Sequence, residues 1–169
     1  METAMTIHDT NILRAAAADI RLGGLGIRML AASGGTGGHA ALLEHPIAPR
    51  SLGAPIHTHS REDEFSYIAE GQVGFMIGDR ILEAKAGDFV AKPRGIPHAF
   101  WNASDKPAHI VELIVPGGFE GYFSEMAAVL NAPQPDHARA GEVCGRYGIT
   151  MDLDSIGELH RRFALACPL

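Results

Sequence analysis

Three histidines and one glutamate are the residues of this chain best suited to bind a metal ion. His57 and His59 form an H-x-H pair, and side chains two residues apart in a strand point to the same face of a sheet. Imidazole is a good ligand for zinc, copper, iron and nickel. Glu64 follows soon after, where an adjoining strand could bring its carboxylate back beside the two imidazoles. One H-x-H pair alone is weak evidence for a metal site.

His98 is the fourth candidate ligand because of the turn before it. Residues 93–97 contain two prolines and a glycine. Proline fixes φ and glycine permits positive φ, so this segment is a rigid, tightly turned approach to a new strand that begins with His98. Two further acids, Glu62 and Asp63, compete with Glu64 for the role of carboxylate ligand. We interpret both as solvated charges of a turn.

Three neutral imidazoles and one carboxylate would leave part of a metal's coordination sphere open, as catalytic sites require. This ligand set is compatible with Fe, Mn, Ni, Co, Cu or Zn as the divalent ion. We therefore predict one divalent transition metal as cofactor, of open identity, with a preference for a redox-capable metal. Glu64 has a second potential role, as a catalytic general base toward a substrate hydroxyl.

The elements that must position these residues have the pattern of β-strands. Between residues 53 and 116, short apolar segments alternate with Gly, Pro, Asn or Asp, which is typical of an all-β sandwich or barrel. Two more strands are predicted at 25–32 and 39–47. The glycine-rich run between them, at 33–38, lacks the GK[ST] ending of a phosphate-binding loop. Residues 109–115 form a strongly apolar strand.

Beyond residue 118 the apolar period changes to that of helices. Apolar residues at three- and four-residue steps predict an amphipathic helix over 119–130, and residues 133–147 are predicted to be a linker. Ser155 and Glu158 have the S-x-x-E form of a capping box, which predicts the start of a second short helix. Its buried stripe would consist of Ile156, Leu159 and Phe163.

Both metal-ligand segments resemble the two motifs of the cupin superfamily. The first motif, H-x-H, then Glu, then Gly, and the second, G, P-x-G, H and N, occur in order and with the family's spacing. One departure lies upstream, where the family's leading glycine is replaced by Ser51 and Gly53 stands nearer the first histidine. We interpret this as a change at a turn. The residues that carry the resemblance are His57, His59, Glu64 and Gly71, followed by Gly87, Pro93, Gly95, His98 and Asn102.

The resemblance is strong over residues 40–116. It implies an all-β fold, a cupin jelly-roll β-barrel with short C-terminal helices, and a metal bound inside the barrel by His57, His59, Glu64 and His98. The whole chain is similar to the single-domain, quercetin-dioxygenase-like cupins. That similarity implies an oxygen-dependent cleavage of a small enol or aromatic molecule.

Composition bounds the remaining possibilities. The chain has 169 residues and a formal net charge of −6, and its few basic residues are scattered, so we expect no nucleic-acid partner. Without an apolar run of about 18 residues we expect no membrane partner. The start of the chain does not resemble a signal peptide, and Cys144 and Cys167 are expected to be reduced thiols, so we predict a cytoplasmic protein.

We predict one barrel with two flanking segments. Residues 1–22 would form an N-terminal extension with helix propensity at the alanines 15–18, residues 23–118 the cupin barrel, and residues 119–169 a helical tail packed on the barrel. Exposed strand edges invite pairing, so we expect a homodimer. Segment 23–47 would supply either the paired strands or simply the outer sheet of one subunit.

Three functions remain open from the residues. The first is a metal-dependent dioxygenase acting on a small enol or aromatic molecule. The second is a non-redox metal-dependent isomerase, lyase or hydrolase, and the third is a non-catalytic cupin that binds metal or a small molecule. Large apolar side chains would line the pocket, about half of them by strand alternation. The candidates are Phe65, Tyr67, Phe75, Met76, Phe100 and Trp101.

Overall fold

The computed structural model describes residues 20–166, which form two antiparallel β-sheets with a shared core and three short α-helices. One sheet has the strand order β1-β2-β3-β10-β5-β8 and the other β11-β4-β9-β6-β7, so strands distant in sequence lie side by side as in a jelly roll. The strands are β1 (Ile20–Leu22), β2 (Leu25–Ala31), β3 (Ala41–Ile47), β4 (Ser51–His59), β5 (Asp63–Glu70), β6 (Gln72–Ile77), β7 (Arg80–Lys85), β8 (Phe89–Lys92), β9 (His98–Asn102), β10 (Ala108–Val115) and β11 (Ile149–Asp152).

Alternation along the strands separates the barrel interior from its outer surface. In β3 and β10 every second side chain is buried, as expected for strands with one face on a core. The glycine-rich run between β2 and β3 forms a short 3-10 turn at Ser33–Thr36. The strands predicted at 25–32, 39–47 and 109–115 are confirmed as β2, β3 and β10. The core between the sheets includes Ile27, Leu43, Ile68, Phe75 and Ile110.

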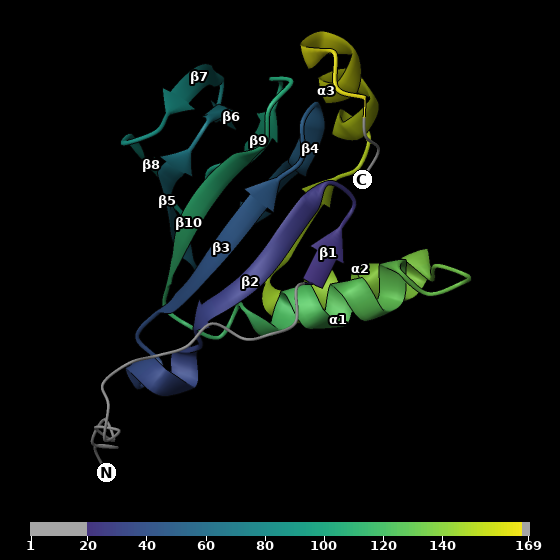
Figure 1. Ribbon diagram of the computed structural model, residues 1–169. Helices are drawn as coiled ribbons and strands as arrows, with labels where there is room; N and C mark the ends of the chain where they lie inside the picture. The colour runs from purple at the N-terminus through teal and green to yellow at the C-terminus, as the bar shows by residue number, and fades with distance from the viewer. Residues whose placement is uncertain (1–19, 167–169) are drawn as a thin grey trace.

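The helices pack on two different parts of this barrel (Figure 1). α1 (Gly121–Leu130) and α2 (His137–Tyr147) lie against each other, in contact with β1 and β11 respectively. α1 contributes Tyr122, Phe123 and Met126 to the core between the sheets. α3 (Ser155–Phe163) instead contacts β4, and its Leu159 packs on the outer side of β4 and β9 in a second cluster.

Two of the helix predictions need correction. The predicted linker at 133–147 is wrong, because α2 occupies 137–147. This helix has one fully buried side chain, Val143, so its apolar pattern is weak. Its ends nevertheless carry ordinary start and stop signals: Asp136, the N-cap, accepts a hydrogen bond from the Arg139 N–H, and Gly148, the C-cap, adopts the left-handed conformation.

The predicted capping box at Ser155 is also wrong. Ser155 is the first residue of α3 and not its cap. Its hydroxyl donates to the Asp152 carbonyl at 2.6 Å and accepts from the Ile56 N–H at 3.0 Å. The serine therefore ties the start of α3 to β4. The predicted buried stripe is confirmed, since Ile156, Leu159 and Phe163 all belong to the cluster on the outer side of β4 and β9.

The upstream departure from the cupin pattern lies inside β4, so our interpretation of it as a turn is wrong. Ser51 and Gly53 are both buried residues of this strand, and the pairing of β4 with β9 is shifted next to them, between Leu52 and Ala54. A Cβ on Gly53 would lie 2.1 Å from Cε2 of Phe100. Glycine is needed here because the Phe100 ring fills the space above the backbone.

We expect Gly53→Ala to lower the free energy of unfolding by about 1–3 kcal/mol, because the Phe100 ring must move to admit the methyl group. Urea denaturation followed by circular dichroism measures this. Gly34→Ala is the control, since an added Cβ there meets nothing within 4 Å. Equal midpoints for both variants would show that the core accommodates the methyl group freely.

The predicted division at residues 22 and 118 stays a prediction. Residues 1–19, with the alanine run, and residues 167–169, with Cys167, lie outside the described residues. Within the described part, Ile20–Leu22 pairs with β2, and Ile149–Asp152 pairs with β4. Segments on both sides of the predicted barrel thus contribute strands to its sheets.

Candidate metal centre

The four predicted ligands come together inside the barrel. One ligand atom from each of His57, His59, Glu64 and His98 lies within 4.8 Å of the others, and all four residues are buried. The histidines come from β4 and β9 of one sheet, and Glu64 from β5 of the other. The site therefore lies between the two sheets.

Strand register explains why the histidines meet. His57 and His98 are direct cross-strand partners, and opposite residues of an antiparallel pair share a face. Their ring centroids are 4.3 Å apart. His59, two residues along β4, falls on the same face, with its ring 5.6 Å from that of His98. Strand alternation thus places His57 and His59 on one face of β4, as predicted.

The loop before His98 is held by its neighbours. The Gly95 N–H donates to the His59 carbonyl at 2.8 Å, and the Arg94 N–H donates to Asp63 at 2.9 Å. Gly95 has φ of 74°, a conformation that favours glycine. The expected rigid turn is present, and it delivers His98 beside β4.

Backbone carbonyls fix two of the imidazoles. Nδ1 of His57 lies 2.8 Å from the Pro55 carbonyl, and Nδ1 of His98 lies 2.9 Å from the Ile96 carbonyl. A carbonyl oxygen only accepts hydrogen bonds, so each Nδ1 carries the proton. In the neutral ring Nε2 then presents a lone pair. Burial, together with the charges of His98 and His59, holds the pKa of His57 well below its usual range, so this ring is neutral near pH 7.

This arrangement fits a cation between the ligands. Nε2 of His98 lies 3.2 Å from Oε2 of Glu64, and Nε2 of His59 lies 3.5 Å from Oε1. A bare imidazole nitrogen and a carboxylate oxygen both offer lone pairs, and such neighbours repel unless a proton or a metal ion lies between them. The donor set of three imidazoles and one carboxylate suits a divalent transition metal.

A buried lysine accompanies the glutamate. Lys92, in β8, is the cross-strand partner of Glu64, and its Nζ lies 3.1 Å from Oε2 of Glu64 and 3.0 Å from Oε2 of Glu112. Burial alone would raise the pKa of Glu64, but the nearby charge of Lys92 holds it well below its usual range. Glu64 is therefore an ionised carboxylate.

Glu112 completes a buried polar group beyond the ligands. Its Oε2 also accepts a 2.7 Å hydrogen bond from Ser66. Burial raises the pKa of Glu112 to about 7, although the nearby charge of Lys92 opposes that rise. The sequence reasoning missed both Lys92 and Glu112. The signal that could have found Glu112 is strand alternation, which places it between the buried Ile110 and Ile114.

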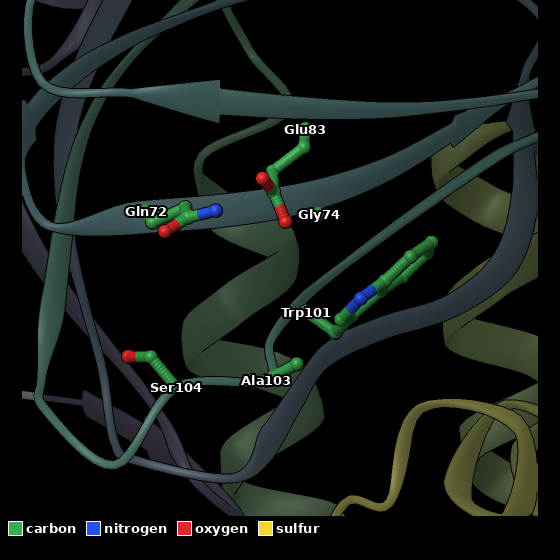
Figure 2. Close-up of a pocket in the computed structure, with 6 residues that line it drawn as sticks. All are labelled: Gln72, Gly74, Glu83, Trp101, Ala103 and Ser104. Carbon is green, nitrogen blue, oxygen red and sulfur yellow. The ribbon is translucent and has the colours of Figure 1, made fainter.

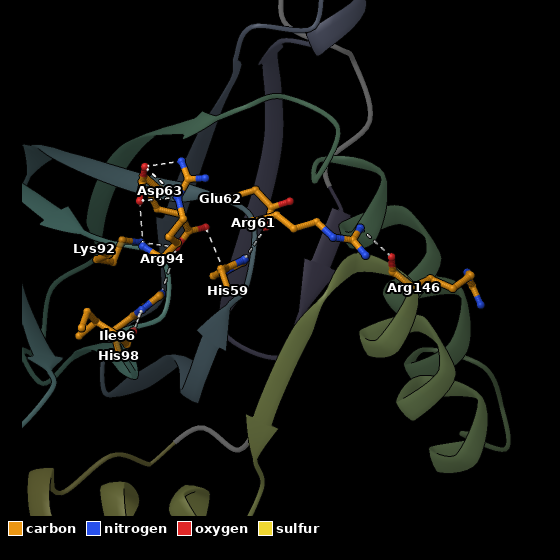
Figure 3. A network of polar contacts seen from close by, with 10 residues as sticks. His59, Arg61, Glu62, Asp63, Lys92, Arg94, Ile96, His98 and Arg146 are labelled. Carbon is orange, nitrogen blue, oxygen red and sulfur yellow. Dashed lines mark hydrogen bonds and ion pairs between the residues drawn. The ribbon is translucent and has the colours of Figure 1, made fainter.

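The two competing acids have different positions. Asp63 is on the surface, where Arg94 donates to both of its oxygens, and this hydrogen bonding lowers the pKa of Asp63 to about 2. This position is consistent with the interpretation of Asp63 as a solvated charge. Glu62 is 6% exposed, so its interpretation as a solvated charge is wrong. Figure 3 shows Glu62 beside His59.

Aromatic side chains from the C-terminal segment adjoin the histidines. The Phe119 ring meets the His59 ring edge-on, with centroids 4.5 Å apart, and stacks on Tyr122 at 4.8 Å. Of the six large apolar residues predicted to line the pocket, Phe75 and Phe100 belong to the core between the sheets. Tyr67 is exposed, and Met76 and Trp101 pack against α3 on the outer side. We expect about half of these six side chains to point into the barrel, and fewer than half of them belong to its core.

A separate hollow of about 170 Å³ lies elsewhere, and none of the four candidate ligands lines it. Figure 2 shows its polar side chains, Gln72, Glu83 and Ser104, around the edge of Trp101. Because Trp101 packs on the outer side of the sheet with α3, this hollow belongs to the surface and not to the interior site.

Comparison with known proteins agrees with this architecture. Residues 44–115 match the family described as Cupin domain, a range that contains all four candidate ligands. The structure of KdgF from Halomonas sp. has a TM-score of 0.52 and 14% identity, with 58% of this chain and 84% of that chain covered. The chain therefore has the cupin fold, and the predicted fold class is confirmed.

Two further solved structures share the fold. A Streptomyces PAC13 variant, solved with uridine, has a TM-score of 0.52 and 15% identity, covering 66% of this chain and 84% of that chain. The formate complex of Lactobacillus farciminis oxalate decarboxylase has a TM-score of 0.52 and 14% identity, covering 74% of this chain and 40% of that chain. Likeness at these identities concerns the fold alone.

Comparison with curated protein sequences gave no significant match. Among residues 20–166, no helix has the length and apolar character needed to cross a membrane.

Proposed function

We propose that this chain is a metal-dependent cupin that binds one divalent transition metal on His57, His59, Glu64 and His98 and acts as a dioxygenase on a small enol or aromatic molecule. The observation that carries the proposal is the buried gathering of these four side chains, whose ligand atoms lie within 4.8 Å of one another. The bound metal would supply Lewis acidity and, if redox-active, electrons for oxygen chemistry.

The chain's own residues prepare this site for a metal. Carbonyl oxygens of Pro55 and Ile96 hold two imidazoles in the tautomer that leaves Nε2 free. Lys92 keeps Glu64 ionised. Ligands must be deprotonated to bind a metal, so these contacts favour binding near neutral pH.

The surroundings of the histidines support a planar, unsaturated substrate. Phe119 and Tyr122 form an aromatic surface on one side of His59, and aromatic walls with a few polar groups are usual in small-molecule sites. Two proteins with this fold were solved with small oxygen-containing ligands, uridine and formate. This supports a small-molecule partner for the site.

We assign Glu64 two roles, ligand first and general base second. Its low pKa suits metal binding and makes it a weak base. A proton could pass to the Glu64 carboxylate only from a substrate hydroxyl that the metal has made more acidic.

Glu64→Gln tests both roles. We expect the variant to retain metal at reduced occupancy and to lose most activity, because an amide is a weaker ligand and a poor base. Metal content by elemental analysis and oxygen uptake with enol and phenolic compounds measure the two effects. Glu70→Gln, an exposed residue of the same strand, is the control. Full activity in Glu64→Gln would remove this residue from the mechanism.

A non-redox isomerase, lyase or hydrolase is the second candidate. The observation that favours it is the buried Lys92–Glu112 pair, because a carboxyl group with a pKa of about 7 can hold or release a proton near neutral pH. Metal content of the protein purified without chelator or nickel affinity separates the candidates. Iron, manganese, nickel or copper would favour the dioxygenase, zinc alone the non-redox enzyme, and no metal a binding module.

A further inference from the structure

The three histidines of the candidate metal centre are held in two different ways. Nδ1 of His57 and Nδ1 of His98 each face a backbone carbonyl two residues earlier in the chain. Nδ1 of His59 faces Oε2 of Glu62 at 3.4 Å. One imidazole therefore has a carboxylate behind it, while the other two have neutral acceptors.

The contact between His59 and Glu62 involves two atoms that lack any other hydrogen-bond partner. Both Nδ1 of His59 and Oε2 of Glu62 are buried, and neither has a hydrogen bond within the part of the chain that is described. Burying such groups unpaired is costly. The 3.4 Å separation is just beyond an ordinary hydrogen bond, so a small side-chain rotation would pair the two atoms.

Glu62 is held inside by contacts of its neighbours with the C-terminal segment. The Ser60 N–H donates to the Gly148 carbonyl at 3.0 Å, and Arg61 donates to the Arg146 carbonyl at 3.1 Å. Figure 3 shows Arg61 reaching toward Arg146 while Glu62 lies on the His59 side of the turn. The end of α2 thus fixes the turn so that Glu62 cannot easily swing out to solvent.

We infer that Glu62 is a positioning residue for the metal centre, an inference that depends on the proposed metal site. Its carboxylate accepts the Nδ1–H of His59 and so directs the Nε2 lone pair toward the metal. It also makes His59 the most strongly donating imidazole, because a negative charge behind the ring raises ligand basicity. The Phe119 ring against His59 limits rotation from another side.

Cobalt(II) binding by Glu62→Gln and Glu62→Ala tests this inference. We expect affinity to fall about 10-fold in Glu62→Gln, which keeps an acceptor but loses the charge, and up to about 100-fold in Glu62→Ala. The visible absorption of bound cobalt should shift in both, since the donor strength of His59 changes. Glu70→Gln, an exposed carboxylate of β5, should behave as the wild type.

The thermal midpoint of the metal-free protein separates positioning from mere structural support. We expect Glu62→Gln to unfold at or above the wild-type midpoint without metal, because a buried charge has been removed, and to gain less from added cobalt. A lower metal-free midpoint with an unchanged cobalt affinity and spectrum would overturn the inference. Failure of the wild type to bind cobalt would instead refute the proposed metal site itself.

Discussion

His98→Ala should lower metal affinity by about 10-fold or more. His98 supplies one of four donor atoms, and even the loss of a group behind a ligand costs about 10–100-fold in other metal sites. Its side chain is fully buried and is held by the Ile96 carbonyl. His59→Ala should have a similar effect. Metal content after dialysis, followed by competition with a coloured chelator, measures both.

His39→Ala is the matched control for these variants. His39 is exposed in the loop before β3, so its loss should leave metal content unchanged. Protein should be prepared without nickel affinity, so that the metal measured is not acquired in purification. If His59→Ala and His98→Ala both kept the wild-type metal content, the assignment of these residues as ligands would be refuted.

Lys92→Met should lower the stability of the metal-free protein by about 3–5 kcal/mol. Removing one partner of a buried ion pair leaves the others uncompensated, and Lys92 lies at about 3 Å from both Glu64 and Glu112. Added metal should restore part of the loss, since it places another positive charge next to Glu64. Urea denaturation with chelator and with metal gives both quantities.

Two further variants locate the cause of that loss. Lys85→Met removes an exposed lysine at the end of β7 and should change stability by no more than about 0.5 kcal/mol. The double variant Lys92→Met with Glu112→Gln should be more stable than Lys92→Met alone, because one of the two stranded carboxylates is gone. If the double variant lost the sum of both single effects, Lys92 and Glu112 would not be coupled, and the ion-pair explanation would fail.

The sequence predicts the strands of the cupin fold, and it singles out four residues that lie close together in the structure, because the signals for both are local. Alternation places His57 and His59 on one face, and the proline and glycine turn before His98 depends on the conformations of those residues alone. Neither signal depends on contacts between distant segments. The gathering of the candidates in the structure follows from register, in which His57 and His98 are partners.

What the sequence does not predict depends on contacts between distant segments. Glu62 lies in an acidic segment that is typical of a solvated turn. It is buried because Ser60 and Arg61 form hydrogen bonds with the end of α2. The sequence of 133–147 predicts a linker and not this helix, because α2 buries little apolar surface. The burial of Lys92 likewise depends on two carboxylates from other strands.

The pairing of β11 with β4 has a consequence for the order of events during synthesis. Ile149 and Met151 are the cross-strand partners of His59 and His57, so the histidine-bearing strand leaves the ribosome well before the strand that covers its edge. Until residues 149–152 follow, that edge has unpaired backbone groups, and exposed strand edges are prone to wrong pairing. Both metal-ligand strands, β4 and β9, can therefore pair with each other before the outer edge of β4 is covered, and that edge closes only when β11 is added.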